Sequence, residues 1–257
     1  MSDFNSMERM ICIAARNLED GAVVVVGTGA PCAAAMLAQK TSAPNLVIMF
    51  EAGGIAPLLP TMPISVGDSR TTHKALMAST MPEIMENCQR GLVDYCFLGG
   101  AQIDRFGNLN STIIGDDYTK PKVRFPGSGG ANDLASLCWR TMIVTPQDNK
   151  RFVEKLDFRT TPGYLEGGTS RYDAGLPLGT GPYRVITDIG VYGFAPDTKE
   201  MQLLQLHPDR SIGDVNDNSG FEIHIPKTIE HTEAPSEEEL GVLRDEVDPL
   251  GYIIGRV

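Results

Sequence analysis

The chain has 257 residues, of which 42% are apolar, and a formal net charge of −11 at pH 7. This composition supports a sizeable core and argues against disorder. The acidic balance excludes a typical nucleic-acid partner, because phosphate binding needs a basic surface. No apolar run approaches the roughly 20 residues that span a bilayer, and the start MSDFNSMERM does not resemble a secretory signal. We therefore expect a soluble, cytoplasmic protein that has no membrane partner.

The five cysteines and four histidines show no metal-binding pattern. No two cysteines form a CxxC pair, and the histidines form neither HxxxH nor HExxH. Scattered cysteines in apolar stretches are typical of buried, reduced thiols rather than disulfides. We expect no metal site.

The first part of the chain predicts strands that alternate with helices. Apolar residues at helical spacing predict a helix over 6–19 with Ser6 as its cap, and the run VVVV over 23–26 predicts a buried strand. A helix of small residues is expected within 30–44, followed by a strand over 45–50. Strand, helix and strand in this order predict a βαβ unit with parallel strands.

Further elements follow along the chain. Segment 71–91 is helical in parts, and strands are expected over 92–100 and 139–146. Segment 183–208 predicts strands around a PDTKE turn, before a short helix capped by Ser236.

This order predicts an α/β protein with an open, mostly parallel sheet flanked by helices and a β-rich C-terminal part. A single domain over 1–257 is the simplest organisation. Ligands of open α/β sheets bind outside the carboxyl ends of the strands, so the residues that follow each strand are the candidates for chemistry.

Two glycine-rich segments follow predicted strands. GTGAPC over 27–32 has Cys32 where a dinucleotide fingerprint needs its third glycine, so we expect a tight turn there rather than an NAD site. In the segment 97–112, Gly99 and Gly100 permit close approach of another chain segment, although many of its polar residues can simply shape a loop.

A third glycine-rich segment, RFPGSGGANDLAS over 124–136, leads into a predicted helix. Free backbone N–H groups at such a junction favour an anion or an oxyanion. The alternative is a flexible loop without a ligand.

Glu51 stands at the end of the predicted strand 45–50 and is followed by Ala52, Gly53 and Gly54. These small residues are expected to leave space in front of the carboxylate. A carboxylate partly stripped of water is a better nucleophile, provided that hydrogen-bond donors surround it. The alternative is an ordinary solvated or ion-paired carboxylate.

Several collinear segments together resemble the β subunit of class I coenzyme A transferases, most closely the glutaconate CoA-transferase β subunit. The resemblance covers nearly the whole chain and is carried by VVVVGTGAP, FEAGG, SVGDSR, FLGGAQIDRFGNLNSTIIGD, RFPGSGGAND, KRFVEKLDFRTTPGY and EVDP. It implies an open α/β sheet of the CoA-transferase or NagB/RpiA-like type. It also implies a hetero-oligomer with a similar α subunit and an active site at the interface of the two chains.

The resemblance implies that Glu51 is the nucleophile of a CoA-transferase. Glu51 would attack an acyl-CoA and carry CoA as a glutamyl thioester, with no permanently bound cofactor and with coenzyme A as a substrate. The backbone N–H groups around Gly129 and Gly130 would stabilise the oxyanions. The groups expected to line the binding site for substrate or CoA are Gly53, Gly54, Gly99, Gly100 and Gln102.

The sequence leaves open the role of Ser69 and Arg70 and the reaction that the chain serves. Ser69 and Arg70 can anchor the distal carboxylate of a dicarboxylic acyl group, or they can belong to a surface ion pair. Ala52 also differs from the serine or asparagine common after the nucleophile in this family. A CoA-ester hydrolase, a decarboxylase or a non-catalytic supporting subunit on the same scaffold are the alternative functions.

Overall fold

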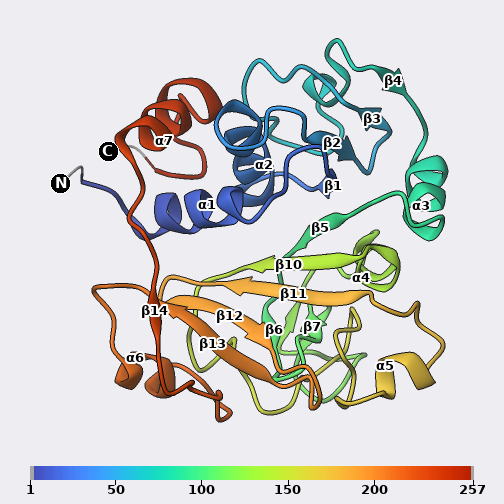
Figure 1. The fold of residues 1–257 in the computed structure, drawn as a ribbon. Helices are drawn as coiled ribbons and strands as arrows, with labels where there is room; N and C mark the ends of the chain where they lie inside the picture. Colours follow the sequence, from blue (N-terminus) through green and yellow to red (C-terminus); the bar gives the residue numbers. More distant parts are fainter. Residues whose placement is uncertain (1–2, 256–257) are drawn as a thin grey trace. The chain divides into compact units, whose positions relative to one another are not determined.

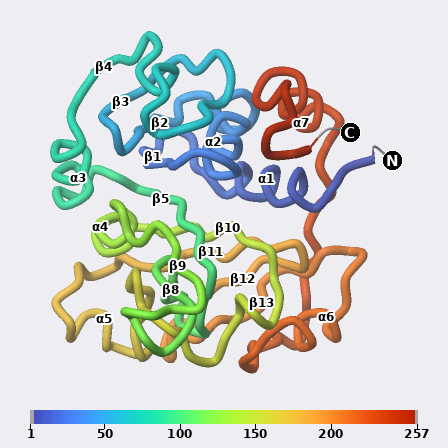
Figure 2. Tube along the Cα trace, turned by 180° about the vertical axis from the view of Figure 1, so that it is seen from behind, coloured from blue at the N-terminus to red at the C-terminus, as the bar shows by residue number. Residues whose placement is uncertain are grey.

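The computed structural model describes residues 3–255, which divide into two compact units. Unit 1 holds the chain up to Phe97 and again from Glu233, and unit 2 holds Leu98–Thr232. Figure 1 and Figure 2 trace the chain through both units. The expected single domain over 1–257 stays a prediction.

In unit 1, the predicted βαβ motif is confirmed. Strand β1 (Val23–Val26) runs parallel to β2 (Val47–Phe50), and helix α2 (Ala30–Lys40) connects them. Strand β5 (Tyr95–Leu98) pairs with β1, also in parallel. Two short antiparallel strands, β3 (Gly54–Ile55) and β4 (Met77–Ala78), extend the sheet beyond β2, which gives the order β5-β1-β2-β3-β4.

Helix α1 (Ser6–Arg16) begins after Asn5, which is the cap in place of the expected Ser6. The Asn5 side chain accepts the Glu8 N–H at 2.9 Å, and the Glu8 carboxylate accepts the Asn5 N–H at 2.9 Å. This capping box satisfies two helix donors at once. The helix ends earlier than predicted because Asn17 caps it, donating from its side chain to a carbonyl of the last turn at 2.8 Å.

The C-terminal segment belongs to unit 1 because it packs back onto the first helices. Helix α7 (Glu237–Val242) continues into a π-helical turn, η2 (Leu243–Val247), and both contact α2. Figure 1 shows α7 beside α1 and α2. Arg244 binds the fully buried Glu8 carboxylate through Nε at 2.6 Å and Nη2 at 3.0 Å. A buried carboxylate needs such a partner. The other helices of unit 1 are η1 (Ser69–Thr72) and α3 (Met81–Gln89).

Unit 2 confirms the β-rich C-terminal part. Its larger set of strands has the order β14-β13-β12-β11-β10, in which β10–β11 and β13–β14 are parallel and the other pairs are antiparallel. The bounds are β10 Arg140–Val144, β11 Gly181–Ile186, β12 Gly190–Phe194, β13 Met201–Leu206 and β14 Glu230–His231.

Short elements complete unit 2. Two small antiparallel pairs join β6 to β7 and β8 to β9, and three short helices follow along the chain. Their bounds are β6 Gln102–Ile103, β7 Leu109–Asn110, β8 Ile113–Ile114, β9 Val123–Arg124, α4 Ala131–Leu137, α5 Ser170–Asp173 and α6 Ile212–Asp217.

The structure also bears on the cysteines, on membrane spans and on metal sites. All five cysteines are free and buried, as expected. Across residues 3–255, no helix combines the length and the apolar character that a membrane span requires. Within the same range, His, Cys, Asp and Glu side chains form no group that could hold a metal ion.

A buried polar turn organises unit 2. The Asn108 side chain donates to the Asp104 carboxylate at 2.8 Å and accepts the Gly163 N–H at 2.7 Å. Gly163 lies against the backbone of this turn: a Cβ there would be 2.3 Å from the Gly107 carbonyl carbon and 2.4 Å from the Phe106 oxygen. Only glycine fits this position.

Gly163→Ala should therefore destabilise the chain by about 3 kcal/mol, at the upper end of overpacking costs, and lower Tm by about 6–12 °C. Gly241→Ala is the matched control, since Gly241 lies in helix α7 with open space around its Cα. The control should be neutral or stabilising by about 0.5–1 kcal/mol. Thermal melting of both variants checks this, and an unchanged Tm for Gly163→Ala would contradict the packing described.

Candidate active site

Glu51 lies in a tight turn directly after β2, in unit 1. The Gly53 N–H donates to the Phe50 carbonyl at 2.9 Å and closes the turn. Because Val26 of β1 pairs with Phe50 of β2, this turn lies beside the loop that follows β1, at the carboxyl end of both parallel strands. The structure therefore places Glu51 where open α/β sheets bind ligands.

The Glu51 carboxylate is half-buried, and within residues 3–255 it makes no hydrogen bond and no ion pair. An ion-paired carboxylate would have its lone pairs engaged and would be a poor nucleophile. The alternative of an ion-paired Glu51 thus has no support in the described chain, and the side chain is available for chemistry.

The structure shows why glycine is needed at the two positions that follow Ala52. A Cβ on Gly53 would lie 2.1 Å from the Ser79 carbonyl oxygen, and a Cβ on Gly54 would lie 1.9 Å from that of Thr71. Gly53 also has φ +118°, which disfavours other residues. Neighbouring backbone therefore requires glycine at these two positions, a reason that the sequence did not predict. Their contact with substrate stays a prediction.

Arg70 lies in a local ion pair. Its Nη2 is 2.5 Å from the Asp68 carboxylate and its Nε is 3.0 Å away, while Nη1 donates to the Met62 carbonyl at 2.9 Å and to Thr61 Oγ1 at 3.1 Å. The hydrogen bonds from Arg70 hold the pKa of the Asp68 carboxyl well below its usual range. Of the two interpretations left open, this geometry favours the ion pair.

Ser69 is exposed and opens the 3₁₀ turn η1, next to Arg70. Its carbonyl accepts a 3.2 Å hydrogen bond from the Thr72 hydroxyl. A direct contact of Ser69 or Arg70 with substrate stays a prediction, and for Arg70 it requires release of Asp68.

Gly99, Gly100 and Gln102 lie in unit 2, after β5. A Cβ on Gly100 would be 3.1 Å from the Gln102 carbonyl oxygen and 3.2 Å from that of Asn110, so Gly100 serves a close backbone approach as predicted. The Gln102 side-chain oxygen accepts the Asn110 amide at 2.7 Å and the Asp157 N–H at 3.0 Å. Among the described residues its amide nitrogen has no hydrogen-bond partner, so this nitrogen is the group that can donate to a ligand.

The glycine loop, defined here as residues 127–130, leads into α4. Gly129 has φ +50° and Gly130 is the cap of the helix. Within residues 3–255, neither of their N–H groups has a hydrogen-bond acceptor. Two adjacent unsatisfied N–H groups are the donors that an oxyanion site needs.

The structure brings together the two candidate segments of unit 2. The Ala101 N–H donates to the Asn110 carbonyl at 2.8 Å, and the Gly127 N–H donates to the Ser111 carbonyl at 3.0 Å. The neighbouring residues Asn110 and Ser111 thus connect the segment that contains Gln102 with the glycine loop. Sequence reasoning missed this connection, although the polar run NLNST contained its residues.

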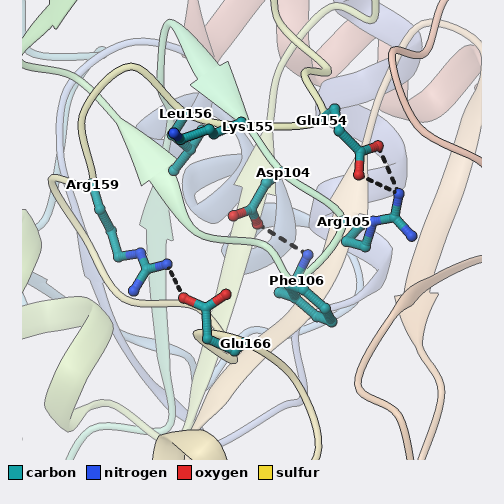
Figure 3. A pocket seen from close by; sticks show the side chains of 8 residues that line it. All are labelled: Asp104, Arg105, Phe106, Glu154, Lys155, Leu156, Arg159 and Glu166. Atoms are coloured by element: carbon teal, nitrogen blue, oxygen red, sulfur yellow. Dashed lines mark hydrogen bonds and ion pairs between the residues drawn. The ribbon is translucent and has the colours of Figure 1, made fainter. Parts of the chain in front are cut away.

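A polar pocket of about 420 Å³ also opens in unit 2, and Figure 3 shows its lining. Arg105 pairs with Glu154 at 2.6 Å, and Arg159 pairs with Glu166 at 2.5 Å. Burial raises the pKa of Asp104, which also lines this pocket. None of the site residues predicted from the sequence lines it.

The comparisons with known proteins agree with the fold and with the segments described. The model of the family described as "Coenzyme A transferase" matches residues 7–218. The chain is similar to the B subunit of 3-oxoadipate CoA-transferase of Pseudomonas knackmussii, with 41% identity over 245 residues, 95% of this chain and 94% of the relative. It is similar to the B subunit of glutaconate CoA-transferase of Acidaminococcus fermentans, with 38% identity over 253 residues, 96% of this chain and 94% of the relative.

Similarity extends to a solved structure. The crystal structure of glutaconate coenzyme A-transferase from Acidaminococcus fermentans superposes with a TM-score of 0.93 at 35% identity, covering 99% of each chain. The chain therefore belongs to the coenzyme A transferase family. Within that family it is a CoA-transferase chain of the β-subunit type.

Arg70→Met should lower stability by about 1 kcal/mol, because the Asp68 carboxylate loses a charged hydrogen-bond partner near the surface. In the assembled enzyme, KM should change to the same small extent for monocarboxylate and dicarboxylate acceptors. Melting curves and acceptor kinetics measure both effects. Arg159→Met, which removes a more exposed ion pair with Glu166, is the control and should change neither the stability nor KM. A rise in KM for dicarboxylates alone would instead assign Arg70 to the substrate.

Proposed function

We propose that this chain is the β subunit of a CoA-transferase that moves CoA between an acyl-CoA and a carboxylate acceptor through a glutamyl-CoA thioester on Glu51. The half-buried Glu51 carboxylate, which no described residue binds, is the observation that carries this proposal. The membership of the CoA-transferase family supports it.

In the first half of the proposed reaction, a Glu51 oxygen attacks the thioester carbonyl and CoA leaves as its thiolate. The product is a mixed anhydride between the acyl group and Glu51. The thiolate then attacks the glutamyl carbonyl, which releases the donor as a carboxylate and leaves CoA on Glu51. The thioester's free energy is thus kept on the protein instead of being lost to water.

In the second half, the acceptor carboxylate attacks the glutamyl thioester and CoA thiolate leaves again. The thiolate attacks the acceptor carbonyl of the new anhydride, which forms the product acyl-CoA and restores the Glu51 carboxylate. Each addition creates an oxyanion, which we assign to the N–H groups of Gly129 and Gly130. Loss of one such donor typically costs about 3–4 kcal/mol of barrier.

Coenzyme A enters this scheme as a substrate, and the scheme needs no permanently bound cofactor. The amide nitrogen of Gln102 and the backbone of Gly99 and Gly100 are our candidates for contacts to the acyl group or to the CoA arm. Water has to be excluded from the anhydride, because hydrolysis would turn the enzyme into a thioesterase.

A dicarboxylic acyl group is the proposed substrate class. Glutaconate and 3-oxoadipate, after which the two similar relatives are named, both carry a second carboxylate. A cationic or strongly donating group is then required for the distal carboxylate.

The proposed partner is a CoA-transferase α subunit. Both similar relatives are B subunits by name, and a chain of net charge −11 is poorly suited to bind the phosphates of CoA alone. Cations from the partner would complete the site at the interface. The five free thiols fit a reducing compartment, so we place the enzyme in the cytoplasm.

Glu51→Ala in the assembled enzyme should lower kcat by at least about a thousandfold, because no nucleophile remains. Glu51→Asp shortens the side chain by one methylene group, which moves the carboxylate back, and should lower kcat by about a hundredfold. Steady-state transfer to an acceptor and CoA release without acceptor are the two assays. Glu86→Ala, an exposed glutamate on α3, is the control and should transfer normally.

The same assays separate the alternatives. Full turnover by Glu51→Ala would make this chain a supporting subunit. Rapid thiol release by the wild type without transfer to any acceptor would indicate a hydrolase, and loss of CO₂ from the acyl group would indicate a decarboxylase.

The purified chain without an α subunit should show CoA transfer at background level. Activity should rise as the α subunit is added and should level off at a fixed ratio of α to β subunits. CoA-transfer assays across that titration measure this. Ordinary turnover by the chain alone would contradict a site completed by the partner.

A further inference from the structure

The glycine loop is tied down at both ends by side chains to which the proposed chemistry assigns no role. At its start, the Ser111 hydroxyl donates to the Gly127 carbonyl at 3.1 Å, and the Gly127 N–H donates back to the Ser111 carbonyl at 3.0 Å. Just beyond its end, the Asn132 side-chain amide donates to the Thr160 carbonyl at 3.0 Å. Gly129 and Gly130 lie between these two attachments.

Packing does little to hold the loop between the attachments. A Cβ placed on Gly127 or on Gly129 would meet no heavy atom within 4 Å, and both residues have positive φ, +94° and +50°. Glycines in open space have many accessible conformations. Within the loop, the Ser128 carbonyl accepts the Ala131 N–H at 2.9 Å and the Ser128 hydroxyl accepts the Asn132 N–H at 3.2 Å, which closes a turn around Gly129 and Gly130. The hydrogen bonds at the two ends hold this turn against the rest of unit 2 and so set the direction of its N–H groups.

Both attachments lead to one buried residue, Thr160. Its hydroxyl accepts the Ser111 N–H at 2.9 Å and lies 2.7 Å from the Thr112 hydroxyl, while its own N–H donates to the Leu109 carbonyl at 2.8 Å. Its carbonyl accepts the Asn132 amide, as described above. Thr160 and β7 thus form a rigid support to which the loop is fastened from two sides.

We propose that Ser111 and Asn132 are positioning residues that hold the glycine loop with the N–H groups of Gly129 and Gly130 aimed at the developing oxyanion. The inference rests on the proposed function of these two glycines. Donors fixed before the reaction stabilise the transition state without reorganisation, whereas misplaced donors weaken it and leave ground-state binding largely intact. Loss of either attachment should therefore act on kcat more than on KM.

The test uses the assembled enzyme with two substitutions that remove one hydrogen bond each. Ser111→Ala deletes the hydroxyl, and Asn132→Asp keeps the shape of the side chain but replaces its N–H donor by an oxygen. Each should lower kcat by about tenfold to a hundredfold, the effect of a misplacement of about 1 Å. KM for acyl-CoA should stay within about twofold, because the oxyanion forms only in the transition state and ground-state binding does not use these donors.

Two further measurements separate positioning from simple stability. Amide hydrogen exchange over 127–131 should accelerate in both variants, while Tm should fall by no more than about 2–4 °C, as for a loss of about 1 kcal/mol. Ser111→Thr keeps the hydroxyl and should restore most of kcat. Thr119→Ala is the control, because its exposed hydroxyl bonds only within its own turn, to Asp117.

Wild-type kcat in both Ser111→Ala and Asn132→Asp would overturn the inference, as would a loss confined to KM or one that follows Tm without faster exchange of the loop. If one of the two variants does not fold, the kcat of the other variant tests the inference. The Glu51 variants distinguish this failure from failure of the proposed function: an essential Glu51 with unaffected positioning variants would refute only the inference. Full turnover by Glu51→Ala would refute the proposed function itself.

Discussion

The turn that carries Glu51 depends on the close approach of neighbouring backbone to Gly53 and Gly54. Ser79 and Thr71 lie so near that a Cβ at either glycine would overlap their carbonyl oxygens, at 2.1 and 1.9 Å. This approach lets β3 fold back on β2 immediately after the turn. The chain therefore reverses within a few residues, and the carboxylate is held at the end of β2 without any hydrogen bond from the described residues to its own oxygens. The Glu51 backbone is thus fixed in place, while the carboxylate oxygens stay free to attack a substrate.

In unit 2, hydrogen bonds rather than close packing hold the glycine loop in position. Polar residues of 102–112 bond to one another, as Gln102 and Asn110 show, and they reach the glycine loop through Ser111. Buried hydrogen bonds of this kind restrict the backbone to one conformation. The loop can thus be rich in glycine, with the Gly129 and Gly130 N–H groups left without an acceptor in the described chain, and still be fixed. Catalysis by preorganised dipoles requires this combination.

Much of the fold can be predicted from local sequence, whereas the contacts that require a particular residue at a particular position cannot. The run Val23–Val26 and the small-residue helix after it predicted the βαβ unit, because β-branched runs and helical periodicity are local signals. The sequence did not predict the backbone contacts that require Gly53 and Gly54, since close approach of distant backbone leaves no local signal. The Arg70 ion pair could equally have been a substrate anchor, because only the three-dimensional contacts distinguish the two. Glu51 was identified from its position after a strand and from family resemblance, and the structure adds that the carboxylate is unengaged.

Covalent attachment of CoA to the Glu51 carboxylate can be measured by mass spectrometry of this chain, assembled with its α subunit and mixed with an acyl-CoA in the absence of an acceptor. The proteolytic peptide containing Glu51 should gain the mass of CoA less one water, and addition of an acceptor carboxylate should remove it. An unmodified Glu51 peptide under conditions of active transfer, or CoA attached to a different residue, would rule out the proposed glutamyl-CoA intermediate.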